Sequence, residues 1–149
     1  MKLYTIIINE ETKEVLIINQ EEAKSLGYEE MDVEFAYNNK AYVLGYAPEK
    51  PLELLKEEKI AELRKQRDIY KKKTYLKEGY TMWDFEPYSC YNYNNLVRLK
   101  YGWTQEDLDL FDAITSHIVS FYDSKKEAIN NATTKEELDQ IDVVFTDNN

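Results

Sequence analysis

Residues 47–51 read Ala-Pro-Glu-Lys-Pro, and they separate two different hydrophobic patterns. Each proline fixes φ and pushes the residue before it towards extended backbone, so a regular element does not continue through this stretch. Apolar residues form short β-branched runs before it and recur at helical spacing after it. The sequence therefore predicts a β-hairpin subdomain at 1–47, a proline-containing linker at 48–51, a helical subdomain at 52–145 and a frayed tail at 146–149.

The part before the linker has the alternation of a small sheet. A short helix at 21–26 is expected between its strands, because Gly27 can adopt the left-handed conformation that commonly ends helices. Asn38 and Asn39 suit the positive φ of a tight turn. Such a sheet has one good apolar face, which the helical part or another subunit must cover. The strand runs predict two antiparallel hairpins, formed by residues 3–8 with 15–18 and by residues 33–37 with 41–46.

Helices dominate the part after the linker. Apolar residues at helical spacing predict a long amphipathic helix over 52–73, and a short helix is expected over 92–100. A second long helix begins after Thr104, whose hydroxyl and the carboxylate of Asp107 form a capping pair, and runs to about Asn130. Thr134 repeats the pattern before a short terminal helix. The fold class is therefore α+β, and the sheet is expected to pack on a helical core that includes Leu55, Leu63, Phe111, Ile114 and Ile118.

Nine aromatic residues crowd into residues 75–103. Aromatic side chains bring large area to a core or to an interface, and both interpretations stay open here. Pro87 and Gly79 oppose a regular element that would bury them all. Charge is also low from 80 to 101, as in the centre of an interface. We therefore expect a protein-binding or self-association surface whose exposed members are Trp83, Tyr88, Tyr91 and Tyr93.

The charge excludes several classes of protein. The formal net charge is −10, so coating of nucleic acids or anionic membranes is not expected. Residues 51–79 are mildly basic, with nine Lys or Arg against six acids, and their basic end suits either the negative end of a helix dipole or a polyanion. The sequence has no apolar run long enough for a membrane span and no signal-peptide pattern. The lone Cys90 fits a reducing compartment.

The sequence contains no convincing set of catalytic, metal-binding or cofactor-binding residues. His117 is the only histidine, and Cys90 with His117 lacks the context of a nucleophile and its base. The acidic residues at 106, 107, 109 and 112 have helical spacing and are typical of a solvated helix face. With four glycines, no phosphate-binding loop can be identified. We expect no catalytic residues, no bound metal and no cofactor.

Three stretches together carry a resemblance to a known family: residues 58–68 (EKIAELRKQRD), 112–118 (DAITSHI) and 126–138 (KEAINNATTKEEL). They resemble an uncharacterised helical module of bacteriophage tail-fibre-associated and tail-assembly proteins, over roughly residues 52–142. Members often insert a β-hairpin before the long helix, and residues 100–103 are too short for one. The family has no established catalytic residues. The resemblance implies a non-enzymatic protein of the virion tail or of the host cytoplasm during assembly.

Two functions follow as hypotheses. The first is a tail-fibre-associated structural or assembly protein that acts through protein contacts and has protein partners or copies of itself. The second is a small acidic phage inhibitor of a host defence factor, which presents carboxylates where nucleic-acid phosphates would bind.

Overall fold

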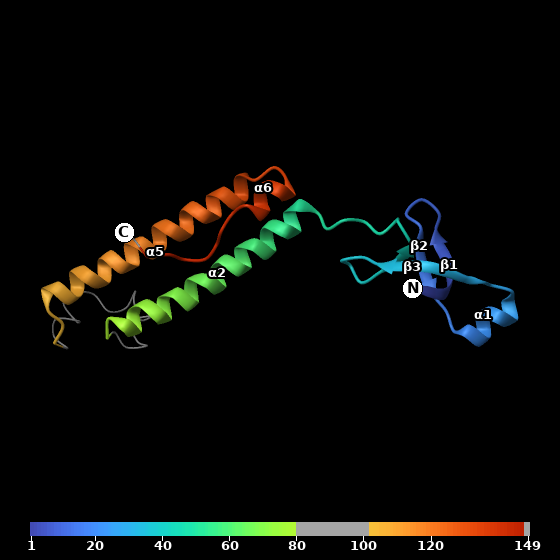
Figure 1. Cartoon of the computed structure of the whole chain (residues 1–149), viewed down its shortest axis with the longest axis horizontal. Helices are drawn as coiled ribbons and strands as arrows, with labels where there is room; N and C mark the ends of the chain where they lie inside the picture. The colour runs from blue at the N-terminus through green and yellow to red at the C-terminus, as the bar shows by residue number, and fades with distance from the viewer. Residues whose placement is uncertain (80–101, 148–149) are drawn as a thin grey trace. The chain divides into compact units, whose positions relative to one another are not determined.

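The computed structural model of the chain describes residues 1–79 and 102–147 (Figure 1). The chain divides into two compact units, Met1–Pro51 and Leu52–Asn149, and the boundary falls at the end of the proline-containing linker. The first unit holds all the strands described, and the second holds the long helices. The predicted α+β class is confirmed.

Four antiparallel strands form the first unit: β1 (Lys2–Asn9), β2 (Glu14–Ile17), β3 (Glu30–Phe35) and β4 (Ala41–Val43). Both predicted hairpins are present, since β1 pairs with β2 and β3 pairs with β4. The sheet order is β1-β2-β4-β3, and the sheet closes because β1 also pairs with β3. The unit is therefore a small closed barrel.

Strand β1 closes the barrel by dividing its length between two neighbours. Its first half pairs Leu3 with Met31, and its second half pairs Ile6 with Leu16, with a register irregularity between Ile7 and Asn9. Irregularities of this kind bend and twist a strand, which closure requires. The apolar face of the sheet, which was expected to need a covering surface, is instead the interior of the barrel, because the sheet closes on itself.

The barrel interior is small. Val15, Val33 and Ala41 are its buried residues, and Leu3, Ile7, Met31 and Val43 pack around them. The connecting helix α1 (Gln20–Leu26) ends at Gly27, where φ is 79°, as the sequence predicts. Asn39 takes the expected positive φ in the turn before β4.

The second unit contains α2 (Leu52–Lys77), α5 (Gln105–Asn131) and α6 (Lys135–Asp139). Helix α2 runs four residues beyond the predicted end at Lys73. The caps of the other two are as predicted: Thr104 and Asp107 form a full capping box, and the Thr134 hydroxyl accepts from the amide of Glu137. The helix expected over 92–100 lies outside the described residues.

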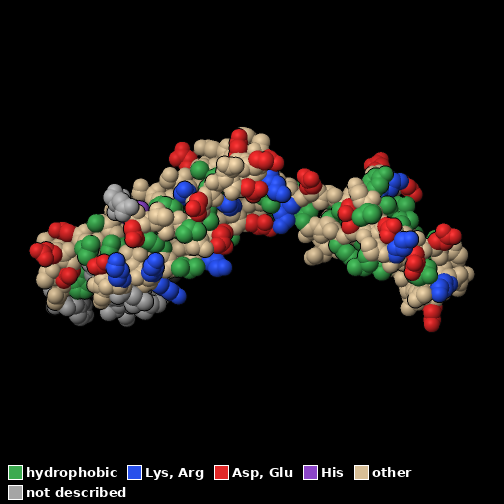
Figure 2. Space-filling view, viewed as in Figure 1, with side chains coloured by type: hydrophobic (Ala, Val, Ile, Leu, Met, Phe, Trp, Pro, Cys, Tyr) green, Lys and Arg blue, Asp and Glu red, His purple; other side chains and the backbone are tan. Residues whose placement is uncertain are grey.

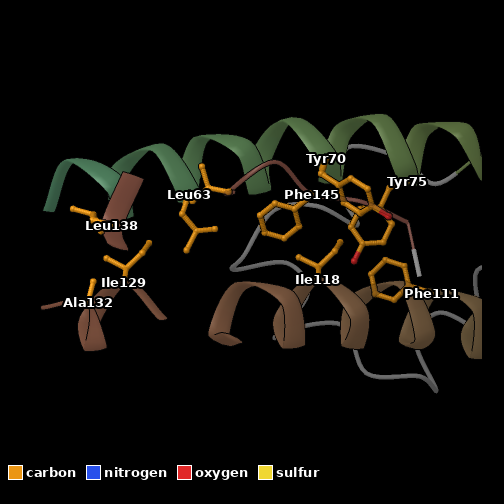
Figure 3. Close-up of a cluster of buried hydrophobic side chains, with 10 residues drawn as sticks. Leu63, Tyr70, Tyr75, Phe111, Ile118, Ile129, Ala132, Leu138 and Phe145 are labelled. Atoms are coloured by element: carbon orange, nitrogen blue, oxygen red, sulfur yellow. The ribbon is translucent and has the colours of Figure 1, made fainter. Parts of the chain in front are cut away.

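Helices α2 and α5 lie side by side, and their facing side chains form the larger core (Figure 3). Leu63, Phe111 and Ile118 are buried there, with Leu55 and Ile114 partly buried against them, so all five predicted core residues belong to one cluster. Tyr75 stacks on Phe111 with ring centroids 5.0 Å apart, and its hydroxyl hydrogen-bonds the Thr115 hydroxyl at 2.6 Å. The expected packing of the sheet on this core stays a prediction.

An extended segment after α6, residues 141–147, completes the helical core; we call it the strap. Its exposure alternates, with Val143 and Phe145 buried and Val144 exposed by 52%. The Phe145 ring lies against Phe121 and Tyr70, at centroid distances of 4.3 and 5.6 Å. The strap therefore packs as a strand does, with every second side chain turned into the core.

Candidate interaction surfaces

The residues that the sequence predicts for a protein interface, Trp83, Tyr88, Tyr91 and Tyr93, lie outside the described residues, as does Cys90. Their role stays a prediction. The described part of the chain offers two other surfaces: the outer face of the barrel and the groove that holds the strap.

The outer face of the barrel is apolar over β1 and β2. Ile6 lies opposite Leu16 in the register, and Thr5, next to Ile6, is buried. Successive strand residues point to opposite faces, so Ile6 and Leu16 point outwards. Leu16 is 53% exposed and Ile8, near the end of the same hairpin, is 56% exposed. We call Ile6, Ile8 and Leu16 the hairpin patch.

Other large hydrophobic side chains of the same unit are also exposed. In Figure 2, hydrophobic side chains are visible on the surface of the barrel unit, among acidic and basic ones. Isolated exposed apolar residues are ordinary, whereas this many on a small unit is typical of a contact surface. The other exposed large hydrophobic residues of this unit are Met1, Ile17, Leu26, Tyr28, Phe35, Tyr37, Leu44 and Tyr46.

The outer face of β3 and β4 is built differently. Tyr42 lies between Glu14 and Glu34 in the register, is buried, and its hydroxyl accepts from the Asn38 side-chain amide at 3.0 Å. The Glu34 carboxylate accepts from the backbone amides of Gly45 and Ala47, both at 2.9 Å. These polar side chains fix the chain as it leaves the barrel, so the hairpin patch is the more apolar side.

In the helical unit, the end of the strap is held by polar contacts in the groove between α2 and α5. The Tyr70 hydroxyl donates to the Asp147 carboxylate at 2.8 Å, and His117 Nε2 lies 2.6 Å from the Thr146 carbonyl oxygen. A carbonyl oxygen only accepts, so Nε2 carries the proton. Thr146 and Asp147, expected to be frayed, are thus each tied to a helix.

Burial raises the pKa of the Tyr70 phenol, and its hydrogen bond to the Asp147 carboxylate raises it further. Both effects disfavour the phenolate, which would repel the carboxylate. Tyr70 therefore stays a hydrogen-bond donor at neutral pH and keeps Asp147 in place.

The groove continues past the strap as an open pocket of about 310 Å³. Leu110, Ala113 and Ile114 form its apolar part. Its polar and charged lining consists of Tyr70, Lys73, Thr74, Lys77, Glu78, His117 and Asp147. The charges of the two lysines and the two carboxylates balance, so the pocket suits an apolar group flanked by polar atoms better than an ion.

The basic end of α2 is partly engaged within the helical unit. Arg67 lies over the Tyr122 ring at 4.9 Å from its centroid, and Arg64 Nε donates to the Tyr122 hydroxyl at 3.4 Å. Two of the basic residues that could have faced a polyanion therefore contact α5 instead.

Within residues 1–79 and 102–147, no group of three or more His, Cys, Asp or Glu side chains is arranged to hold a metal ion. In the same part of the chain, none of the helices combines the length and the hydropathy that a membrane span needs.

Sequence reasoning missed the strap, although a signal for it exists. Ile141, Val143 and Phe145 alternate with exposed residues, which is the period-two pattern of an extended segment with one buried side. The run follows a short helix, and the prediction assigned its residues up to 145 to the helical subdomain and the next two to a frayed tail.

Comparisons of the chain with protein-family models, with curated proteins and with solved structures found no match.

Proposed function

We propose that the protein is a bacteriophage tail-fibre-associated structural or assembly protein that acts through protein contacts and not through catalysis. The resemblance of the helical stretches supports the tail-fibre assignment. The exposed hairpin patch supports action through contacts, and it is the single observation that carries the proposal.

The patch is better explained by binding than by folding. The barrel closes on its own interior, so Ile8 and Leu16 are not needed to fill the core. Fully burying one side chain of this kind contributes about 1.5–3 kcal/mol, so covering Ile8 and Leu16 would stabilise a complex. A tail-fibre subunit with an apolar surface would cover them during assembly in the host cytoplasm or in the finished tail.

Co-expression with a tail-fibre protein from the same genome tests the proposal. The two proteins should co-purify at fixed stoichiometry, and the double variant Ile8→Ser/Leu16→Ser should lose this. Val119→Ser is the matched control, because Val119 is exposed by 52% on α5 in the other unit and should leave the complex intact. If the unaltered chain, the double variant and Val119→Ser all co-purify equally with the tail-fibre protein, the role of the patch is contradicted.

Salt dependence separates this function from the second hypothesis, the nucleic-acid-mimicking inhibitor. Apolar contacts weaken little as salt is raised, whereas binding through surface carboxylates is screened. The exposed acids of α5, Glu106, Asp109 and Asp112, would carry the electrostatic mode. A complex that dissociates in moderate salt and depends on these acids would favour the inhibitor.

A further inference from the structure

We propose that the groove between α2 and α5 is a peptide-recognition site and that the strap is its resident, displaceable ligand. The partner it fits is an extended protein segment with the strap's own pattern: an apolar residue, an aromatic residue two positions later, and a carboxylate two positions after that. In the strap these are Val143, Phe145 and Asp147.

The seated strap itself shows which chemistry the groove accepts. Phe145 is held between Phe121 and Tyr70, and Val143 is buried in the same cluster. Two hydrogen bonds then fix the end of the strap. The Tyr70 hydroxyl donates to the Asp147 carboxylate, and His117 Nε2 donates to the backbone carbonyl of Thr146. Alternate buried side chains with a backbone contact are how extended peptides are recognised.

The open pocket gives an incoming segment a place to begin. It continues the groove past Asp147 and is lined by Leu110, Ala113 and Ile114. An apolar residue two positions after the carboxylate would fill it, and this chain has Asn149 at that position of its sequence. A partner segment with such a residue therefore gains a contact that the strap's sequence does not offer, and it can displace the strap stepwise from that end.

Because the strap already occupies the groove, it competes with any free peptide that could bind there. A tethered segment acts at an effective concentration on the order of millimolar, so a free peptide of the same sequence hardly binds while the strap is docked. Weakening the strap should expose the groove and raise the affinity for the free peptide.

Fluorescence anisotropy of the full chain with a labelled peptide of residues 141–147 tests this. Phe145→Ala in the chain should bind the peptide at least about tenfold more tightly than the unaltered chain does, because the aromatic site is vacated. Asp147→Ala in the chain removes the carboxylate that Tyr70 holds, while the labelled peptide keeps its own, and should give a smaller increase. Val144→Ala is the matched control, since Val144 faces solvent and its loss leaves the strap docked.

The probes also separate recognition from nonspecific binding. The peptide with Phe145→Ala should not bind any variant, and a peptide lengthened by Asn-Leu should bind more tightly than the strap peptide. Should the Phe145→Ala chain keep a native circular dichroism spectrum and bind no better than the unaltered chain, the strap is a structural closure only and the proposal is wrong. If that variant does not fold, Asp147→Ala in the chain decides: peptide binding equal to that of the unaltered chain overturns the proposal.

This inference goes beyond the proposed function, because it concerns the helical unit alone. Loss of the tail-fibre complex in Ile8→Ser/Leu16→Ser would leave it standing, and failure of the peptide test would leave the barrel contact standing.

Discussion

The two units use their apolar residues in opposite ways. In the helical unit, ten buried residues form one cluster with stacked aromatic rings, and the strap seals it. In the barrel, three buried residues form the centre, while Ile8, Leu16 and eight other large hydrophobic side chains remain exposed. The comparison teaches that one unit is stabilised mainly by its own core, whereas the other leaves much of its apolar side-chain surface exposed.

Size accounts for much of the difference. A unit of about fifty residues buries a smaller fraction of its surface than a larger one and is only marginally stable alone. Closure of the barrel gives each of the four strands a paired neighbour on both sides, which compensates in part for the small interior. Stability in the barrel thus depends on backbone pairing and in the helices on side-chain packing.

The largest effect is expected from Phe111→Ala in the helical core. Phe111 stacks on Tyr75 and meets the Trp103 ring edge-on at 5.5 Å, so its removal leaves a cavity between two rings. The variant should lose about 3–5 kcal/mol of unfolding free energy, measured by urea denaturation with helical circular dichroism as readout. Val119→Ala on the same helix should change it by less than about 0.5 kcal/mol. An unchanged midpoint for Phe111→Ala would remove it from the core.

Val33→Ala should destabilise the barrel by a smaller amount. It deletes two buried methyl groups beside Val15 and Ala41, at a cost of about 2 kcal/mol. Relative to the barrel's marginal stability this is large, so faster hydrogen exchange throughout β1–β4 is expected, with α2 and α5 unaffected. Faster exchange in the helices as well would show that the two units unfold together, and the contrast between them would fail.

Sequence reasoning predicted most of the helical unit because its signals are local. Thr104 and Asp107 lie within one turn, Gly27 acts on its own helix, and the stripe through Leu63 and Phe111 repeats along one chain segment. Each feature is decided by residues a few positions apart, which a pattern search can read.

Closure of the barrel could not be read in the same way. The pairing of Leu3 with Met31 joins residues far apart in sequence, and nothing in either strand alone favours it over an open edge. The strap shows the same limit, since Phe145 is buried by α2 and α5 and not by its neighbours. Closure of the barrel and packing of the strap both depend on contacts between residues far apart in the sequence. Local periodicity does not encode such contacts.

Thr5→Val should stabilise the barrel. This result would support the interpretation that the barrel interior contains too few apolar side chains to be very stable. The Thr5 hydroxyl is buried and has no hydrogen-bond partner within the described residues. Valine has nearly the same shape and no polar atom to desolvate, so a gain of about 1 kcal/mol is expected in thermal or urea unfolding. Thr5→Ser keeps the hydroxyl and loses a methyl group, and it should destabilise. Destabilisation by valine would mean that the hydroxyl is satisfied.

The smallest effect is a pH dependence at the cap of α6. The Glu137 carboxylate accepts from the Thr133 amide at 2.7 Å and from the Thr133 hydroxyl at 3.0 Å, and these bonds hold its pKa below the ordinary value of 4.5. A lowered pKa in the folded state means that the stabilisation is complete above about pH 4.5 and disappears as the pH falls through the folded-state pKa.

Glu137→Gln removes the titrating group, so the loss of stability of the helical unit on acidification should be shallower than in the unaltered chain. Glu136→Gln is the matched control, because it removes a carboxylate from the exposed neighbouring position and leaves the bonds between Glu137 and Thr133 in place. Parallel acid profiles for Glu137→Gln and the unaltered chain would show that the bonds to Thr133 do not contribute to holding α6 on the core.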